Sequence, residues 1–260
     1  AQLERGFRWL KFDAPLEQDF LAAYNERLRP RLRITLLVAA VVFTLFGLRD
    51  MLVIPREVWV WTTGIRLGLI VPGILLVRFF SQRSQSDRTQ WWMVAGAALA
   101  VYGLVAAIGI SAKLQHPLPY EGLMLVIFFL YFMSGLRMRA AMLVTVPVVP
   151  VYLLMCTLLH EQAVNVGIQT FYLLVANLIG GLGLYITEHL AREVWLTEQL
   201  ARFRAERDPL TLSFNRRALM THLRRLWSLG RREKATVTTL MIDVDHFKQY
   251  NDRHGHLAGD

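Results

Sequence analysis

The feature that most limits how this chain can fold is a series of long apolar runs between Ile34 and Thr187, where charged residues are sparse. A bilayer core about 30 Å thick is crossed by a helix of about 20 apolar residues. Six stretches meet or approach this length, and the fourth is the shortest. We predict six transmembrane helices, at residues 33–52, 58–80, 91–112, 122–136, 140–159 and 163–187.

The basic residues indicate the orientation of these helices. Cytoplasmic loops of membrane proteins carry an excess of Lys and Arg. Arginines cluster before the first run, between the second and third, between the fourth and fifth, and after the sixth, whereas the alternate connections hold only Arg49, Arg56 and Lys113. We therefore predict that both termini are cytoplasmic, with residues 1–30 forming a cytoplasmic or interfacial helix before the first span.

Composition narrows the class of protein further. Apolar residues make up 54% of the chain, charged residues 19%, and the net charge is +9. Much of the positive excess lies beside apolar runs, where it orients membrane helices, so we expect a lipid bilayer and not a nucleic acid as the partner of this charge. The single cysteine, Cys156, rules out a disulfide framework within one chain.

Two polar residues at membrane depth are candidates for a sensing site. Arg66 falls near the middle of the second run, where a charge is costly unless it faces the bundle interior or water. Asn177 lies near the middle of the sixth. One interpretation is a ligand-sensing pocket; the other is a structural hydrogen bond between the two side chains. The glycines around Arg66, Gly64 and Gly68, and the GGLG run at 180–183 predict close helix contacts.

The sixth helix is predicted to continue beyond the membrane as a signalling helix over residues 188–207. No Gly or Pro interrupts this stretch, and six side chains recur at steps of three and four residues, as in a coiled-coil seam. The pattern favours pairing of two protomers, so we expect a homodimer, although a solvated helix end is the alternative. The seam residues are Ile186, His189, Glu193, Leu196, Leu200 and Phe203.

The last part of the chain, residues 208–260, is rich in charged and polar residues that could bind a ligand. Asn215 is a good N-cap for a helix that follows the break at Asp208 and Pro209. The stretch ATVTTLMID, residues 235–243, is rich in β-branched residues and predicts a strand. A carboxylate at the end of such a strand, here Asp243, is well placed for ligand chemistry in α/β folds.

Two motifs in this segment resemble the GGDEF domain of diguanylate cyclases. DPLTLSFNRR, residues 208–217, is similar to the opening of that domain, and DVDHFKQYNDRHGHLAGD, residues 243–260, matches its DxDxFKxxND and GHxxGD elements. The resemblance implies a ferredoxin-like α/β domain, with residues 208–260 as its N-terminal part. It also implies condensation of two GTP into cyclic di-GMP by two facing domains, in a protein of the bacterial inner membrane.

The resemblance also implies roles for individual residues. Asp243 and the backbone carbonyl of Val244 would bind Mg²⁺ or Mn²⁺, since hard cations prefer oxygen ligands. Phe247 and Lys248 would lie at the phosphates of GTP. By the same resemblance, Asn251 and Asp260 would recognise guanine, whose edge offers both hydrogen-bond donors and acceptors.

The chain departs from the family pattern in two ways. Leu212 stands where the family usually has glycine, and the GG[DE]EF signature does not occur before Asp260. We therefore expect that the parent protein is longer and that residues 208–260 by themselves are inactive and poorly folded. Three alternatives stay open: a degenerate GGDEF receptor that binds GTP without catalysis, a membrane sensor whose cytoplasmic part is incidental, and an adenylate cyclase.

Overall fold

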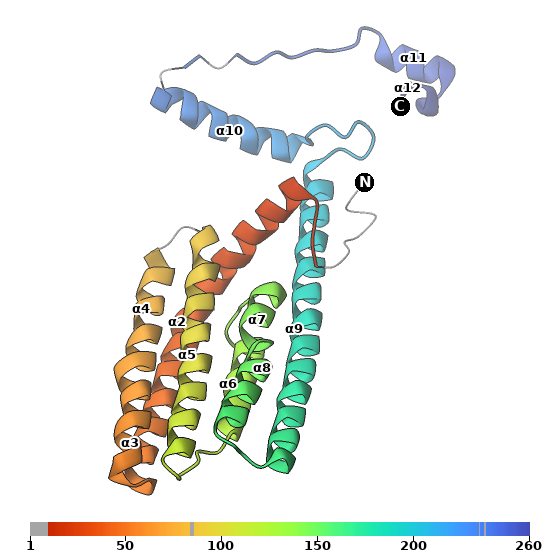
Figure 1. Cartoon of the computed structure of the whole chain (residues 1–260). Coiled ribbons are helices and arrows are strands. Elements are labelled where there is room, and N and C mark those ends of the chain that lie inside the picture. Colours follow the sequence, from red (N-terminus) through yellow and green to blue (C-terminus); the bar gives the residue numbers. More distant parts are fainter. Residues whose placement is uncertain (1–9, 84–85, 234, 237) are drawn as a thin grey trace. The chain divides into compact units, whose positions relative to one another are not determined.

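The computed structural model describes residues 10–83, 86–233, 235–236 and 238–260 of the chain (Figure 1). The beginning of the predicted interfacial segment, residues 1–9, lies outside the described part. Two compact units divide the chain, Ala1–Glu193 and Val194–Asp260.

The first unit is built from helices that run beside one another, with α2 and α5 both packed against α4 (Figure 1). Among the described residues, five helical stretches are long and apolar enough to cross a membrane: Ala14–Val53, Arg56–Arg83, Arg88–Lys113, Met138–Leu158 and Ala163–Glu206. The elements are α2 (Ala14–Val53), α3 (Arg56–Thr63), η1 (Gly64–Ile70), α4 (Val71–Arg83), α5 (Ser86–Lys113), α6 (Glu121–Phe132), α7 (Met138–Thr145), α8 (Val148–Leu158) and α9 (Ala163–Glu206).

The prediction of six spans is not confirmed, because the fourth stretch forms only the 12-residue helix α6. At about 1.5 Å per residue this helix is about 18 Å long, well short of a bilayer core. The helix ends early because Gly135 has a left-handed φ of +71°. The hydroxyl of Ser134 also donates to the Leu130 carbonyl and stabilises the turn that follows the helix.

Prolines interrupt two of the other stretches. Pro147 separates α7 from α8, since a proline has no N–H to continue the helical bonding. Before Pro72 the helix widens into the π-helix η1, where the Val71 N–H donates to the carbonyl of Arg66, five residues back. Pro150 is accommodated within the first turn of α8.

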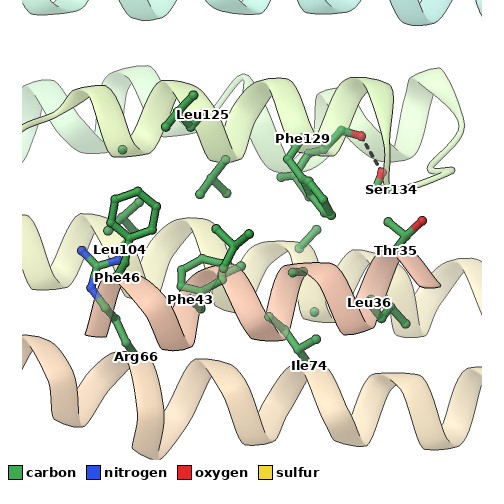
Figure 2. Close-up of a pocket in the computed structure, with 18 of the residues that line it drawn as sticks. Thr35, Leu36, Phe43, Phe46, Arg66, Ile74, Leu104, Leu125, Phe129 and Ser134 are labelled. Carbon is green, nitrogen blue, oxygen red and sulfur yellow. Dashed lines mark hydrogen bonds between the residues drawn. The ribbon is translucent and has the colours of Figure 1, made fainter. Parts of the chain in front are cut away.

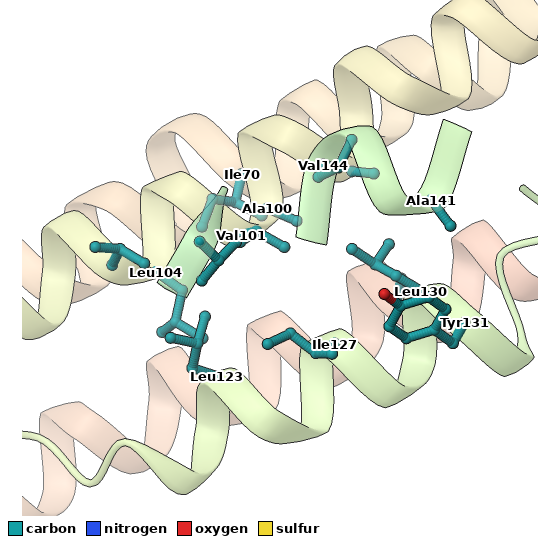
Figure 3. Packing of buried hydrophobic residues seen from close by; sticks show 14 of the residues in the cluster. Ile70, Ala100, Val101, Leu104, Leu123, Ile127, Leu130, Tyr131, Ala141 and Val144 are labelled. Carbon is teal, nitrogen blue, oxygen red and sulfur yellow. The ribbon is translucent and has the colours of Figure 1, made fainter. Parts of the chain in front are cut away.

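Apolar side chains from η1, α5, α6 and α7 pack together inside the first unit. Figure 3 shows Ile70, Val101, Leu123, Ile127 and Val144 meeting between these elements, and all five are buried. Many other apolar side chains point outward, including Leu52, Leu158 and Leu178, which are exposed on their helices. An apolar exterior of this kind favours contact with lipid.

Only one of the two predicted glycine contacts is confirmed. A Cβ added at Gly180 would overlap the ring of Tyr131, and one at Gly183 would overlap the ring of Phe132, so both glycines permit close packing of α9. The prediction for Gly64 and Gly68 is wrong, because an added Cβ there meets no atom within 4 Å. The π-helix η1, which contains both glycines, packs through its buried side chains, Arg66 and Ile70.

The second unit contains the end of α9 and three further helices: α10 (Arg216–Glu233), α11 (Phe247–His254) and α12 (His256–Gly259). The predicted strand at 235–243 is not observed among the described residues. Val237, which falls within this stretch, and Lys234, which precedes it, lie outside the described part. Residues 238–244 have no ladder partner, and no strand is assigned among the described residues. A strand is stable only when a neighbouring strand accepts and donates its backbone hydrogen bonds. The expected α/β ferredoxin-like arrangement is therefore not observed in the described residues.

Candidate functional site

The motif DPLTLSFNRR forms a compact turn between α9 and α10. One carboxylate oxygen of Asp208 accepts hydrogen bonds from the backbone N–H of Leu210 and from the N–H and hydroxyl of Thr211, at 3.0–3.1 Å. The bonds from Thr211 and then that from Leu210 lower the pKa of this exposed carboxyl, because they favour its charged form. Asn215 caps α10, as predicted, by accepting the Ala218 N–H at 3.0 Å.

Leu212 occupies the glycine position of the family pattern and has a left-handed φ of +56°. Its N–H donates to the Asp208 carbonyl and its own carbonyl accepts from Arg207 at 2.9 Å. These bonds hold a leucine in a conformation that costs about 1–2 kcal/mol for residues with a Cβ. The turn therefore forms with a leucine at the position where the family pattern usually has glycine, and this residue is strained.

We predict that Leu212→Gly stabilises this turn by about 1 kcal/mol, since glycine adopts positive φ without a steric penalty. Hydrogen–deuterium exchange of the amides in 206–218 should slow. The matched control is Leu210→Gly, an equally exposed leucine without positive φ, which should speed exchange. Equal effects of the two glycines would contradict the assigned strain.

The residues predicted to bind the metal ion, Asp243 and Val244, lie just before α11. Asp243 is exposed, and one of its carboxylate oxygens accepts the Val244 N–H at 3.0 Å. The Val244 carbonyl accepts the Phe247 N–H at 3.3 Å, which leaves its second lone pair available. His246 takes a left-handed φ of +58° and turns the chain from the extended segment into α11. Both oxygen donors suit a hard cation.

The donor set in the described part is incomplete for a metal ion. Among these residues, no three His, Cys, Asp or Glu side chains lie close enough together to hold a metal ion. Magnesium usually keeps several waters and binds few protein carboxylates together with substrate phosphates, so a site with one carboxylate and one carbonyl fits this ion. The assignment of Asp243 and Val244 as ligands stays a prediction.

The residues predicted to recognise guanine lie on α11 and just after α12, and these two helices pack against each other. The Oδ1 atom of Asn251 is buried and has no hydrogen-bond partner among the residues that the structure describes, and a Cβ added at Gly259 would overlap it. The fold therefore brings Asn251 beside the backbone that leads into Asp260, whose N–H donates to the His256 carbonyl. A buried, unpaired carbonyl oxygen is costly, and a donor on a bound base would satisfy it.

The two residues assigned to the phosphates lie in the first turn of α11. Phe247 is half exposed and Lys248 is exposed. Phe247 and Asn251 are four residues apart and share one face of the helix. Lys248 forms no ion pair with the residues that the structure describes, so its ammonium group is available to an anionic ligand.

The two candidate sensing residues of the first unit, Arg66 and Asn177, do not form a hydrogen bond with each other. The Nε of Arg66 donates to Asp50 at 3.1 Å, and both side chains are buried. Asn177 accepts a hydrogen bond from the Tyr131 hydroxyl at 3.0 Å and donates to the Leu173 carbonyl. Of the two interpretations of these residues, the one in which Arg66 and Asn177 bond to each other is therefore wrong. The signal that could have found the true partner is Asp50 itself, an acid within the first apolar helix.

A second buried charge cluster, which the sequence did not reveal, joins the two ends of the first unit. Arg192 on α9 is 1% exposed and donates to both carboxylate oxygens of Glu17 on α2, at 2.7 and 3.0 Å. Glu188 accepts from the same guanidinium at 3.1 Å and also accepts the Met138 N–H at 2.7 Å. The guanidinium lies 4.3 Å from the ring centroid of Phe20. We call Glu17, Glu188 and Arg192 the arginine clamp.

Comparison with known proteins places the end of the chain in a class. Residues 205–260 match the family model described as diguanylate cyclase, GGDEF domain. An uncharacterized signaling protein of Caulobacter vibrioides is 41% identical over 69 residues, which are 26% of this chain and 8% of that protein. These matches support a GGDEF diguanylate cyclase at the level of the family.

Two relatives carry an enzymatic name. The diguanylate cyclase DgcP of Escherichia coli is 38% identical over 92 residues, 33% of this chain and 26% of that protein. The probable diguanylate cyclase DgcC of the same organism is 46% identical over 54 residues, 21% of this chain and 15% of that protein. The chain thus spans about a quarter or less of the length of these relatives.

Proposed function

We propose that the full-length protein is an integral membrane diguanylate cyclase that condenses two GTP into cyclic di-GMP under the control of its membrane module. The observation that carries this proposal is the segment 243–260, whose sequence matches the family in both its acidic and its Asn–Asp elements. The five long apolar helices support the location in a membrane.

In this proposal each residue of the segment has a role that its chemistry supports. Asp243 and the Val244 carbonyl hold Mg²⁺ or Mn²⁺, which supplies charge stabilisation at the reacting phosphates. Lys248 meets a phosphate as a mobile positive charge, and Phe247 lines the same end. Asn251 and Asp260 hold guanine by its edge, with the buried Oδ1 of Asn251 accepting from the base.

The reaction needs two GTP molecules facing each other, and so we propose a homodimer. The part of α9 that follows the apolar run supports this, because Ile186, Leu190 and Val194 are exposed at intervals of four residues. This stripe differs from the predicted seam, in which Leu196 is buried. The domain boundaries at residues 30, 187 and 207, and the cytoplasmic position of both termini, remain part of the proposal.

We predict that the full-length protein in nanodiscs, given GTP and Mg²⁺, forms cyclic di-GMP, and that Asp243→Ala lowers the rate by at least about 100-fold through loss of the metal ligand. The matched control is Glu233→Ala, an exposed carboxylate at the end of α10, which should leave the rate unchanged. Nucleotide production is measured by chromatography. GTP binding without product in the unaltered protein would overturn the catalytic proposal and favour a non-catalytic GTP receptor.

A further inference from the structure

The first unit encloses an elongated cavity of about 500 Å³ between α2, α4, α5 and α6 (Figure 2). Its lining follows α2 from Thr35 to Arg49, a rise of about 21 Å along the helix. The volume lies within the range of small-molecule sites in proteins. The cavity is therefore long enough for an extended chain and large enough for a ligand.

Most of this cavity is apolar. Figure 2 shows Phe43, Leu104, Leu125 and Phe129 along its length. At one end of the cavity the Ser134 hydroxyl already has a partner inside the protein, since it donates to the Leu130 carbonyl. A hydrocarbon chain is the kind of group that gains free energy by filling such a space.

The opposite end of the cavity is polar, because Arg66 and Arg49 reach it beside Phe46. Arg66 uses its Nε for Asp50, and no other hydrogen-bond partner of its guanidinium is found in the described part of the chain. Glu121 also lines this end, and Asp50 balances the charge of Arg66, so the net charge there is small. This end of the cavity therefore offers N–H donors to a ligand but carries no strong positive charge.

The backbone that carries Arg66 is itself unusual. Arg66 belongs to the π-helix η1, and single π-turns within α-helices occur often at functional sites. The widened turn places Arg66 where it reaches both Asp50 and the cavity. The donor group at the end of the cavity is therefore fixed by an ion pair on one side and open to the cavity on the other.

We propose that this cavity binds a single-chain amphiphile, with its hydrocarbon chain along α2 and a carbonyl or carboxylate head accepting hydrogen bonds from Arg66. A chain without such a head would leave the donors unsatisfied, and a compact polar ligand would leave the apolar length empty. The inference adds a ligand to the membrane module and rests on its proposed place in a membrane. Its test does not depend on cyclase activity.

The test uses the full chain in phosphatidylcholine nanodiscs and palmitic acid with a diazirine in mid-chain. After irradiation, labelled peptides are mapped by mass spectrometry. We expect saturable labelling on α5 and α6 around Leu125 and Phe129, lowered about tenfold by excess palmitic acid or methyl palmitate but not by hexadecane. Non-saturable labelling, or equal competition by hexadecane, would overturn the proposal.

Two variants test the two ends of the cavity. Ala100→Phe places a ring in the apolar part and should lower labelling about tenfold, whereas Ala106→Phe, an exposed alanine of the same helix, should not. Arg66→Lys keeps the pairing with Asp50 but removes the planar donor group, and should weaken competition by palmitic acid several-fold. Unchanged labelling in Ala100→Phe, or unchanged competition in Arg66→Lys, would count against the assignment. The labelling experiment uses no GTP, so it can be interpreted even if the protein makes no cyclic di-GMP.

Discussion

Arg192→Met is expected to open the arginine clamp and to destabilise the contact between the beginning of α2 and α9 by about 3–5 kcal/mol. The substitution keeps the apolar stem but leaves the buried Glu188 carboxylate, and with it Glu17, without a positive partner. Hydrogen–deuterium exchange of residues 10–20 should accelerate by about 100-fold to several thousand-fold, because the free energy of local opening falls by about 3–5 kcal/mol.

The matched control for the clamp is Arg202→Met, which removes an exposed arginine from the same helix and should leave exchange in 10–20 unchanged. The triple variant Glu17→Gln, Glu188→Gln and Arg192→Met should recover much of the lost protection, since it removes the unpaired charges. If Arg192→Met and Arg202→Met behaved alike, the clamp would contribute little to the fold.

The second large effect concerns the buried pair of Asp50 and Arg66. Asp50→Leu is expected to destabilise the first unit by about 3–5 kcal/mol, because it leaves Arg66 buried among apolar helices without its counter-ion. The double variant Asp50→Leu/Arg66→Leu should regain most of that loss, since a well-packed apolar pair costs no desolvation. The midpoint of thermal unfolding in detergent measures both.

This comparison also separates two roles of Arg66. A double variant as unstable as Asp50→Leu would show that Arg66 stabilises the unit by contacts other than its ion pair, such as the one with Phe46, 5.6 Å from the guanidinium. A recovered double variant would leave the charged pair without a net stabilising role. Its retention in the sequence would then agree with a role in ligand binding at the cavity.

Much of the architecture could be predicted from local sequence properties. The long apolar runs predicted the helices of the first unit because backbone groups in a bilayer must bond within their own segment. Asn215 predicted the N-terminal cap of α10, since a capping side chain acts within one turn of its helix. The motif at 243–260 predicted its class for a similar reason, as its residues are close in sequence.

Other features could not be predicted because they depend on which surfaces meet. Run length alone predicted a span at 122–136, but Gly135 and Ser134 end α6 within the bundle. The strand at 235–243 had the composition of a strand and lacks a pairing neighbour among the described residues. Gly64 and Gly68 had the spacing of a helix contact, yet a Cβ added at either would meet no atom of the described residues within 4 Å.

By itself the sequence determined the apolar helices, the cap and turn before α10, and the chemical class of the final segment, because each depends on neighbours within a few residues. Only the tertiary structure decided the partners of the buried charges. Arg66 pairs with Asp50 across two helices, and Arg192 meets Glu17 from the other end of the unit. A charge in an apolar interior requires a counter-ion, but which one it takes depends on packing between helices that are distant in sequence.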